Sequence, residues 1–258
     1  MNYRQGVFTL AKCEQIAETT YSFVITCPEI VSLARAGQFA HLRVPGFSLR
    51  RPISICEVLP KEGTIRVVFD IRGEGTKVLA TLKAGDSIDM MAPIGNGFTL
   101  LEPDKKVIVI GGGIGVPPLL EVAKHYGSNS RAVLGFRSKS AVILQNDFAS
   151  VGCGVHLCTD DGSVGRKGFV TALLKEQLDA KKPDILYACG PKPMLKAVAN
   201  LAKEYGVRCQ HSLEERMACG VGACLGCACK TKKDGKETYS HVCKNGPVFE
   251  AEEVVFDE

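Results

Sequence analysis

Short runs of alternating apolar and polar residues fill the first third of the chain. They include 39-FAHLRV-44, 52-PISICEVL-59, 64-TIRVVFDI-71 and 87-SIDMM-91, with glycine, proline and charged residues between them. This spacing is typical of short antiparallel strands, so residues 7–91 predict a small sheet or barrel. One helix is expected to interrupt the strands over residues 75–82, after the glycine-rich turn 73-GEGT-76.

From about residue 102 the pattern changes, and apolar strands alternate with helical stretches. The first strand, in 106-KVIVIGGGIGVPPLLEVAKHY-126, runs into glycines and then into a helical pattern. Further strands are predicted over residues 131–136, 154–159, 184–189 and 207–212. This alternation is typical of a parallel sheet in an α/β domain.

The glycine-rich turn after the first of these strands is a candidate phosphate site. In such domains the turn approaches a dinucleotide, whose pyrophosphate lies at the start of the next helix. The sequence reads GGGIGVPP, not GxGxxG, so the motif alone is weak. We expect Gly113 and Gly115 to allow the close approach, and Pro117 and Pro118 to open the helix, since proline lacks an N–H that would need a partner there.

A second turn, in 188-ACGPKPML-195, follows another predicted strand. Cys189 ends that strand at the carboxyl edge of the sheet, where ligands bind in open α/β domains, and Pro191 and Pro193 begin the next helix. Two interpretations stay open. The thiol contacts a nicotinamide, or it is a buried strand cysteine, which is common.

Two segments of the first third have side chains suited to a flavin dinucleotide. In 50-RRPIS-54, Arg51 offers a fork of donors for a phosphate and Ser54 a hydroxyl for a ring edge. The turn 73-GEGT-76 leads into a helix whose free N–H groups suit a pyrophosphate. The alternative for Arg51 is a surface arginine beside an edge strand.

Cysteines crowd near the end of the chain, in 216-RMACGVGACLGCACK-230 and at Cys243. Cys219, Cys224 and Cys227 stand at C-x4-C-x2-C spacing with Cys243 as a distal fourth thiol, which is the plant-type [2Fe–2S] ligand pattern. The intervening glycines allow a tight loop whose backbone amides face the sulfurs. The spacing therefore predicts a single-electron carrier.

A structural zinc site is the alternative for these cysteines. Cys229 or His241 would then replace one of the thiols. Zinc sites usually present two short-spaced pairs, whereas here three thiols share one loop and the fourth comes alone, so the spacing favours the cluster. Cys229 is then a spare cysteine, expected to be a small buried hydrophobe.

Composition limits the remaining function classes. The twelve cysteines come without an apolar export signal at the amino terminus, so we expect reduced thiols in the cytoplasm. No apolar run approaches the ~18 residues of a membrane span. The net charge of +4 is spread over 258 residues without basic runs, so the charge pattern does not indicate nucleic-acid binding.

The motifs together resemble a known superfamily. RPIS with GEGT, GGGIGVPP and CGPKPM are similar to the ferredoxin–NADP reductase superfamily, which joins a flavin-binding barrel to a nicotinamide-binding α/β domain. The run ERMACGVGACLGCACK, the late Cys243 and the ending GPVFEAEEVVF resemble the electron-transfer subunits of B-type, NAD-dependent dihydroorotate dehydrogenase. One departure is that Pro52 or Ile53 stands where many superfamily members have an aromatic residue.

The resemblance covers essentially the whole chain and implies its site residues. Its cluster ligands fall on the four thiols named above. No catalytic side chain is predicted, since nothing in the chain supplies a further site for an organic substrate. The FAD contacts implied are Arg51, Pro52, Ile53, Ser54, Val68, Phe69, Asp70, Gly75 and Thr76.

Electron counting orders the three expected cofactors. A nicotinamide exchanges a hydride, an iron–sulfur cluster exchanges one electron and a flavin does both, so FAD must lie between NAD and the cluster. In the resembling family the partner is an FMN-containing catalytic subunit that oxidises dihydroorotate to orotate in pyrimidine (UMP) biosynthesis, in a heterotetramer of two of each chain. The expected function is electron transfer from that partner to NAD+.

Two other functions remain as alternatives. One is an NAD(P)H reductase subunit that feeds a ferredoxin, a hydrogenase or an oxygenase; the other is a zinc-stabilised flavin protein without electron output. A partner would dock near the cluster, where Met217, Val221 and Leu225 either form an apolar contact or pack inside the small module.

The expected fold is a multidomain chain of the α+β and α/β classes. An antiparallel FAD-binding β-barrel is expected over residues 1–101 and a Rossmann-like NAD-binding α/β domain over residues 102–213. A small [2Fe–2S] module is expected over residues 214–258.

Overall fold

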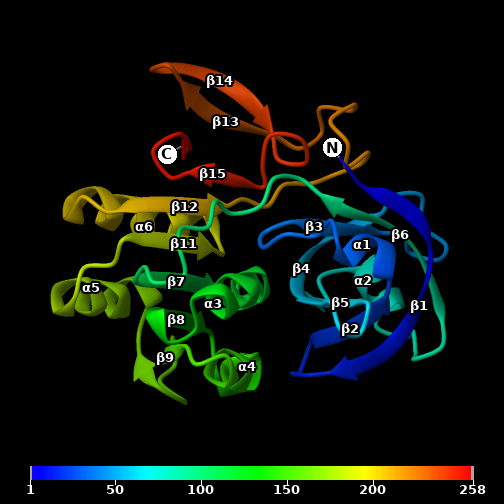
Figure 1. Ribbon diagram of the computed structural model, residues 1–258, viewed down its shortest axis with the longest axis horizontal. Coiled ribbons are helices and arrows are strands. Elements are labelled where there is room, and N and C mark those ends of the chain that lie inside the picture. Colours follow the sequence, from blue (N-terminus) through cyan, green and yellow to red (C-terminus); the bar gives the residue numbers. More distant parts are fainter. Residues whose placement is uncertain (1, 257–258) are drawn as a thin grey trace.

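A closed antiparallel barrel forms the first part of the protein. The computed structural model describes residues 2–256 (Figure 1). The barrel strands follow the order β1-β2-β5-β4-β3-β6. Their bounds are β1 (Arg4–Gln15), β2 (Thr20–Thr26), β3 (Phe39–Leu42), β4 (Arg51–Leu59), β5 (Thr64–Asp70) and β6 (Ser87–Ile94), with the short helices α1 (Pro28–Val31) and α2 (Glu74–Leu79).

The two faces of β3 have different partners. Ala40 and Leu42 point into the barrel core, where they are completely buried. Phe39 points the other way, into a core shared with the α/β domain and the C-terminal segment. This side of the barrel is therefore covered by the rest of the protein.

The interrupting helix is confirmed, with shifted bounds. α2 begins at Glu74 and ends at Leu79, whereas the sequence predicted residues 75–82. The shift at the start has a local cause: Thr76 Oγ1 accepts hydrogen bonds from the amides of Arg72 and Gly73 at 2.8 and 3.3 Å, which caps the helix one residue early.

A seven-stranded sheet forms the middle of the protein, in the order β10-β9-β8-β7-β11-β12-β15. All neighbours are parallel except β15, which runs antiparallel to β12. The strands are β7 (Val107–Gly112), β8 (Ser130–Phe136), β9 (Gly154–Thr159), β10 (Arg166–Lys167), β11 (Ile185–Cys189), β12 (Arg208–Ser212) and β15 (Val248–Glu250); the helices are α3 (Leu120–Tyr126), α4 (Gln145–Ser150), α5 (Val170–Ala180) and α6 (Lys192–Tyr205).

Helices cover both faces of this sheet. Alternate residues of β7 separate the faces: Ile108 and Ile110 pack with α5 and α6, and Val107 and Val109 pack with α3 and α4. The expected prolines do not begin an α-helix directly. They lie in 3-10 turns that lead into α3 at Leu120.

The C-terminal segment lies across both other parts. It contains the hairpin of β13 (Ala228–Lys233) and β14 (Lys236–His241), drawn in orange in Figure 1, and then returns to the sheet as β15. Asn96, just after β6, donates to the carbonyls of Lys244 and Asn245.

The barrel and the α/β domain confirm the expected fold class. The boundaries at 101/102 and 213/214 stay predictions, and β15 adds that the tail shares the α/β sheet.

Within residues 2–256, no helix is both long and apolar enough to cross a membrane.

Candidate functional site

A cavity of about 800 Å³ lies where the barrel, the α/β domain and the C-terminal segment meet. It gathers every residue that the resemblance assigned to FAD. These are Arg51, Pro52, Ile53, Ser54, Val68, Phe69, Asp70, Gly75 and Thr76. Three separate segments of the sequence, at the start of β4, the end of β5 and the start of α2, thus form one continuous wall.

Arg51 lies at the centre of this wall. Its guanidinium carbon is 5.3 Å from the centre of the Phe47 ring, and its Nη1 donates to the carbonyl of Leu49 at 2.7 Å. A methyl group on Gly75 would lie 2.5 Å from Arg51 Nη2, so the glycine leaves room for the guanidinium to lie against α2. The alternative of an arginine beside an edge strand is wrong, because β4 lies between β3 and β5 in a closed barrel.

The rest of the lining was not predicted. It contains Phe39, Phe47, Ile114, Lys192, Pro247 and residues 212–217. Lys192 forms an ion pair of 2.5 Å with Glu215, which joins the start of α6 to the C-terminal segment. Ile114 and Lys192 belong to the motifs GGGIG and CGPKP and could have been found from them. Residues 212–217 lie at the end of a predicted strand and at the start of the cysteine-rich motif, but only the tertiary fold brings them to the cavity.

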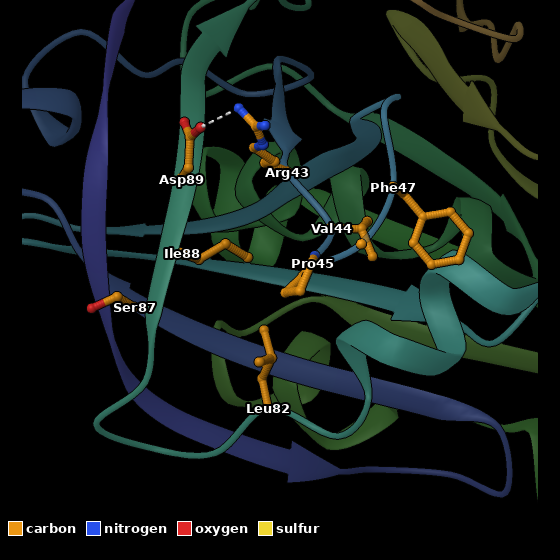
Figure 2. A pocket seen from close by; sticks show the side chains of 9 residues that line it. Arg43, Val44, Pro45, Phe47, Leu82, Ser87, Ile88 and Asp89 are labelled. Atoms are coloured by element: carbon orange, nitrogen blue, oxygen red, sulfur yellow. Dashed lines mark ion pairs between the residues drawn. The ribbon is translucent and has the colours of Figure 1, made fainter.

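A second, smaller pocket of about 320 Å³ belongs to the barrel alone (Figure 2). It lies between residues 43–47 and 82–89, and an ion pair of Arg43 and Asp89 at 3.7 Å borders it. Phe47 lines both this pocket and the larger cavity. None of the predicted site residues lines it, so it carries no part of the expected chemistry.

The two predicted glycines of the nucleotide turn have different surroundings. Gly113 has a φ of +54°, and a methyl group there would meet no atom within 4 Å, so the backbone is open to a ligand. A methyl group on Gly115 would lie 2.4 Å from the carbonyl oxygen of Cys189. Gly115 is therefore needed for packing of the turn against β11, and only Gly113 retains the predicted geometry of ligand approach.

Cys189 is 1% exposed and does not line the cavity. Burial raises the pKa of its thiol well above the usual range; the nearby charge of Glu214 acts in the same direction, and a hydrogen bond with Ser212 opposes them. This geometry favours the second interpretation of Cys189, a buried strand cysteine.

The four cysteines of the C-terminal loop form two pairs. Cys227 and Cys243 have their sulfurs 3.3 Å apart, and the thiol of Cys224 hydrogen-bonds to Cys219. A [2Fe–2S] core needs two thiolates on each of its two irons, which this pairing matches. No group of three His, Cys, Asp or Glu side chains within residues 2–256 is arranged for a single metal ion, as a zinc site would require.

Backbone amides surround the sulfurs. The amides of Val221, Ala223 and Cys224 lie 3.4, 3.3 and 3.4 Å from Cys219 Sγ, and the amide of Gly222 lies 3.1 Å from Cys243 Sγ. Gly222, with a φ of +82°, permits this fold of the loop. The donor set suits anionic sulfur, so these residues fit an iron–sulfur cluster.

The thiol pKa values differ across the loop. Burial alone would raise the pKa of Cys219, but its amide and thiol hydrogen bonds lower the pKa to about 6. Burial and the neighbouring Cys227 raise the pKa of Cys243 to about 12. Because metal ligands must be deprotonated, Cys243 would lose its proton if it held iron.

The remaining residues of the loop separate by exposure. Met217 and Val221 are partly buried against the shared core, whereas Leu225 is 64% exposed with a φ of +60°. A non-glycine residue seldom adopts this conformation, so the loop holds an apolar side chain toward solvent. Cys229 lies on β13 and is partly buried against the shared core.

A closed barrel joined to a parallel nucleotide-binding sheet, with a large cavity at their junction and a four-thiol loop beside it, defines a flavin-dependent reductase with an iron–sulfur module. Residues 214–255 match the family model described as the iron–sulfur cluster binding domain of dihydroorotate dehydrogenase B, which confirms the third part of the expected fold.

The chain belongs to the family of electron transfer subunits of dihydroorotate dehydrogenase B (NAD(+)). The relative from Geobacillus kaustophilus is 43% identical over 256 residues, which cover 96% of this chain and 97% of the relative. The relative from Caldanaerobacter subterraneus is 44% identical over 222 residues, which cover 85% and 87%. Both carry the name of that subunit.

Solved structures agree with this assignment of fold. An NADH-dependent reduced ferredoxin–NADP oxidoreductase, studied for flavin-based electron bifurcation, is 32% identical, with a TM-score of 0.85 over 97% of this chain and 90% of that chain. The cytochrome P450 reductase GcoB from Amycolatopsis is 22% identical, with a TM-score of 0.67 over 79% and 66%, and is similar in fold alone.

Proposed function

We propose that this chain is the electron transfer subunit of an NAD-dependent dihydroorotate dehydrogenase. It is an oxidoreductase subunit that binds FAD and a [2Fe–2S] cluster and uses NAD as a co-substrate. One observation carries the proposal: Phe39 lines the flavin-sized cavity and also packs in the same core as Cys227 and Cys243. The two proposed cofactor sites therefore border the same apolar core.

The FAD site is supported by the chemistry of the first wall. Arg51 supplies a fixed cation for a phosphate, Ser54 a hydroxyl at the start of β4, and Gly75 with Thr76 the turn into α2. A bound FAD supplies the chemistry that joins hydride exchange with a nicotinamide to single-electron exchange with a cluster. No side chain on this chain is needed as an acid or base for that exchange.

The cluster site is supported by the two thiol pairs. Cys219 with Cys224 would hold one iron and Cys227 with Cys243 the other. Four backbone amides already point at two of these sulfurs. Cys229 and His241 have no place in this set.

A catalytic partner completes the enzyme. The partner would carry FMN and oxidise dihydroorotate to orotate in pyrimidine biosynthesis, and the electrons would leave on NAD+. We propose a heterotetramer of two of each chain, with the partner docked against the exposed Leu225 beside the thiols. Twelve free cysteines suit a reducing compartment, so we assign the complex to the cytoplasm.

A ferredoxin-linked reductase is the second candidate function. It is favoured by the 32% identity to the NADH-dependent reduced ferredoxin–NADP oxidoreductase over 97% of this chain. The 43% identity to the dihydroorotate dehydrogenase subunit over 96% of this chain favours the first candidate. Both candidates use the same cavity and thiols, so only the partner and its substrate separate them.

The cofactor assignment is tested on purified protein. We expect one FAD and two irons per chain, and reduction of an artificial dye by NADH. Cys243→Ser should lose iron and keep FAD, and Cys229→Ser should keep both. Loss of iron in Cys229→Ser with normal iron in Cys243→Ser would contradict the ligand assignment.

A further inference from the structure

His41 lies on the outward face of β3, between the flavin strand and the thiol loop. Its backbone pairs with Pro52 of β4, which lines the FAD cavity, and with Met91 of β6. The side chain is 0% exposed. Neither ring nitrogen makes a hydrogen bond of ordinary geometry within residues 2–256; the Arg50 carbonyl is near enough to act on the pKa of the ring but is too poorly placed to count as a bond. A buried polar group without a partner is rare and calls for an explanation.

The imidazole faces the thiol loop directly. A methyl group on Gly220 would lie 2.5 Å from His41 Nδ1 and 3.1 Å from Cε1. Gly220 follows Cys219 and has a φ of +73°, so glycine is required there both by the backbone and by the ring. The loop is thus folded onto the imidazole at the residue next to a predicted ligand.

The ring is neutral at physiological pH. Burial lowers its pKa to about 4, with the positive charges of Arg50 and Arg51 acting in the same direction and the Arg50 carbonyl opposing them. A neutral imidazole still carries one N–H donor. The sulfur atoms of the loop beside it accept hydrogen bonds from amides, so they are acceptors of the kind that this N–H lacks.

We propose that His41 donates a hydrogen bond to a sulfur of the iron–sulfur site beside Cys219 and thereby raises the reduction potential of the cluster. Hydrogen bonds to sulfur stabilise the more negative, reduced state and are among the factors that set cluster potentials. This inference rests on the proposed cluster. It adds a potential-setting residue that comes from the barrel and not from the thiol loop.

The chain offers a matched control in His211 on β12. It is also 0% exposed, also has no partner for either ring nitrogen, and has a pKa lowered to about 4 by burial. Its ring lies 6.0 Å from that of Phe256, and its backbone pairs with Phe249 of β15. Replacement of His211 therefore reproduces the loss of a buried imidazole at a residue that does not contact Gly220.

The first measurement is a redox titration of the cluster by EPR in the holoprotein. We expect His41→Leu to lower the midpoint potential and change the g values at unchanged iron content. His211→Leu should leave both as in the native protein, and His41→Gln, which keeps an N–H donor, should restore part of the potential. An unchanged potential in His41→Leu would overturn the proposal.

A second measurement uses the native protein, in case the variants fail to fold. With ¹⁵N-labelled histidine, pulsed EPR of the reduced cluster should detect coupling to an imidazole nitrogen. The coupling should persist in His241→Gln, whose backbone is near the thiols. A normal cluster without this coupling contradicts the role of His41, whereas native protein without iron contradicts the cluster itself.

Discussion

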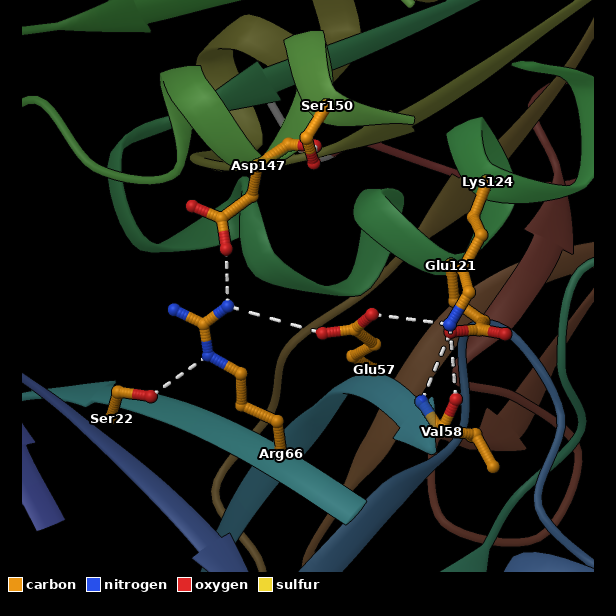
Figure 3. A network of polar contacts seen from close by, with 8 residues as sticks. All are labelled: Ser22, Glu57, Val58, Arg66, Glu121, Lys124, Asp147 and Ser150. Carbon is orange, nitrogen blue, oxygen red and sulfur yellow. Dashed lines mark hydrogen bonds and ion pairs between the residues drawn. The ribbon is translucent and has the colours of Figure 1, made fainter. Parts of the chain in front are cut away.

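The junction between the barrel and the α/β domain has two sides that differ in construction. On one side, a polar network joins the domains (Figure 3): Arg66 of β5 pairs with Asp147 of α4, and Lys124 of α3 pairs with Glu57 of β4 at 3.1 Å. Glu121 accepts the amide of Val58 at 3.0 Å. On the other side lies the 800 Å³ cavity.

The cavity side has no such connection. Of the ion pairs within residues 2–256, none joins the barrel to the α/β domain across the cavity; Lys192 there pairs with Glu215 of the C-terminal segment. Directional contacts on one side fix the angle between the domains, so the other side stays open for cofactors. The comparison predicts that changes on the connected side affect stability and changes on the open side affect binding.

The largest effect is expected inside the α/β domain, where the nucleotide turn packs closely against the backbone of β11. Gly115→Ala should destabilise the protein by about 3 kcal/mol, because the new methyl group meets the Cys189 backbone at 2.4 Å. Gly113→Ala, in open space with a φ of +54°, should cost about 1–2 kcal/mol from backbone strain alone. Urea unfolding measures both, and an equal cost would contradict the distinct roles.

Removal of the positive charge of Arg66 tests the side of the junction where the polar network joins the two domains. Arg66→Met should destabilise the protein by about 2–3 kcal/mol, below the full cost of breaking a buried pair because Asp147 is 32% exposed. FAD affinity should be nearly unchanged. Lys77→Met is the control, since Lys77 pairs only at the surface with Glu74 and should cost little. A large loss of FAD in Arg66→Met would contradict the separation of the two sides.

Arg51→Ala should affect the open side. Loss of one charge-assisted contact costs about 1.5–3 kcal/mol, so FAD should bind roughly 10- to 150-fold more weakly and leave the protein on dilution. Arg43→Ala is a matched control, because Arg43 lies in the neighbouring small pocket and outside the cavity. Flavin fluorescence after gel filtration reports the release, and full retention in Arg51→Ala removes Arg51 from the site.

The smallest effect concerns pH on the connected side. Burial raises the pKa of Glu121, which the Val58 amide and Lys124 only partly offset. A carboxyl with a raised folded-state pKa costs stability at neutral pH, and that cost disappears as the pH falls below the unfolded value of about 4.3. Glu121→Gln should therefore be slightly more stable than the native protein at pH 7, with the difference vanishing near pH 4. The opposite trend would contradict the assignment.

The sequence predicted the strands well because their signals are local. Alternation in 39-FAHLRV-44 and 64-TIRVVFDI-71 marks half-buried strands, and both fall on β3 and β5. The return of residues 248–250 to the α/β sheet was not predicted. β15 is three residues long and owes its place to pairing with β12, which is distant in sequence.

Sequence reasoning found the site residues that belong to a recognisable motif. It missed the residues that only tertiary contacts bring to the site. RPIS and GEGT identified one part of the cavity lining, whereas residues 215–217 belong to the cysteine-rich motif and nothing in that motif placed them at the flavin cavity. For Cys189 the sequence left two interpretations, and only its 1% exposure favours the buried one. His41 has no sequence signal at all, because alternation assigns it to a face of β3 without saying what covers that face.

The central claim is that this chain is one half of an enzyme that carries electrons between a dihydroorotate-oxidising partner and NAD+. The direct measurement is dihydroorotate-dependent reduction of NAD+ by the chain alone, by an FMN-containing partner alone and by both together. We expect NADH to form only in the mixture. We also expect replacement of Leu225 by a charged residue to slow this formation of NADH. NADH formation by this chain alone, or a mixture active only with a ferredoxin, would contradict the claim.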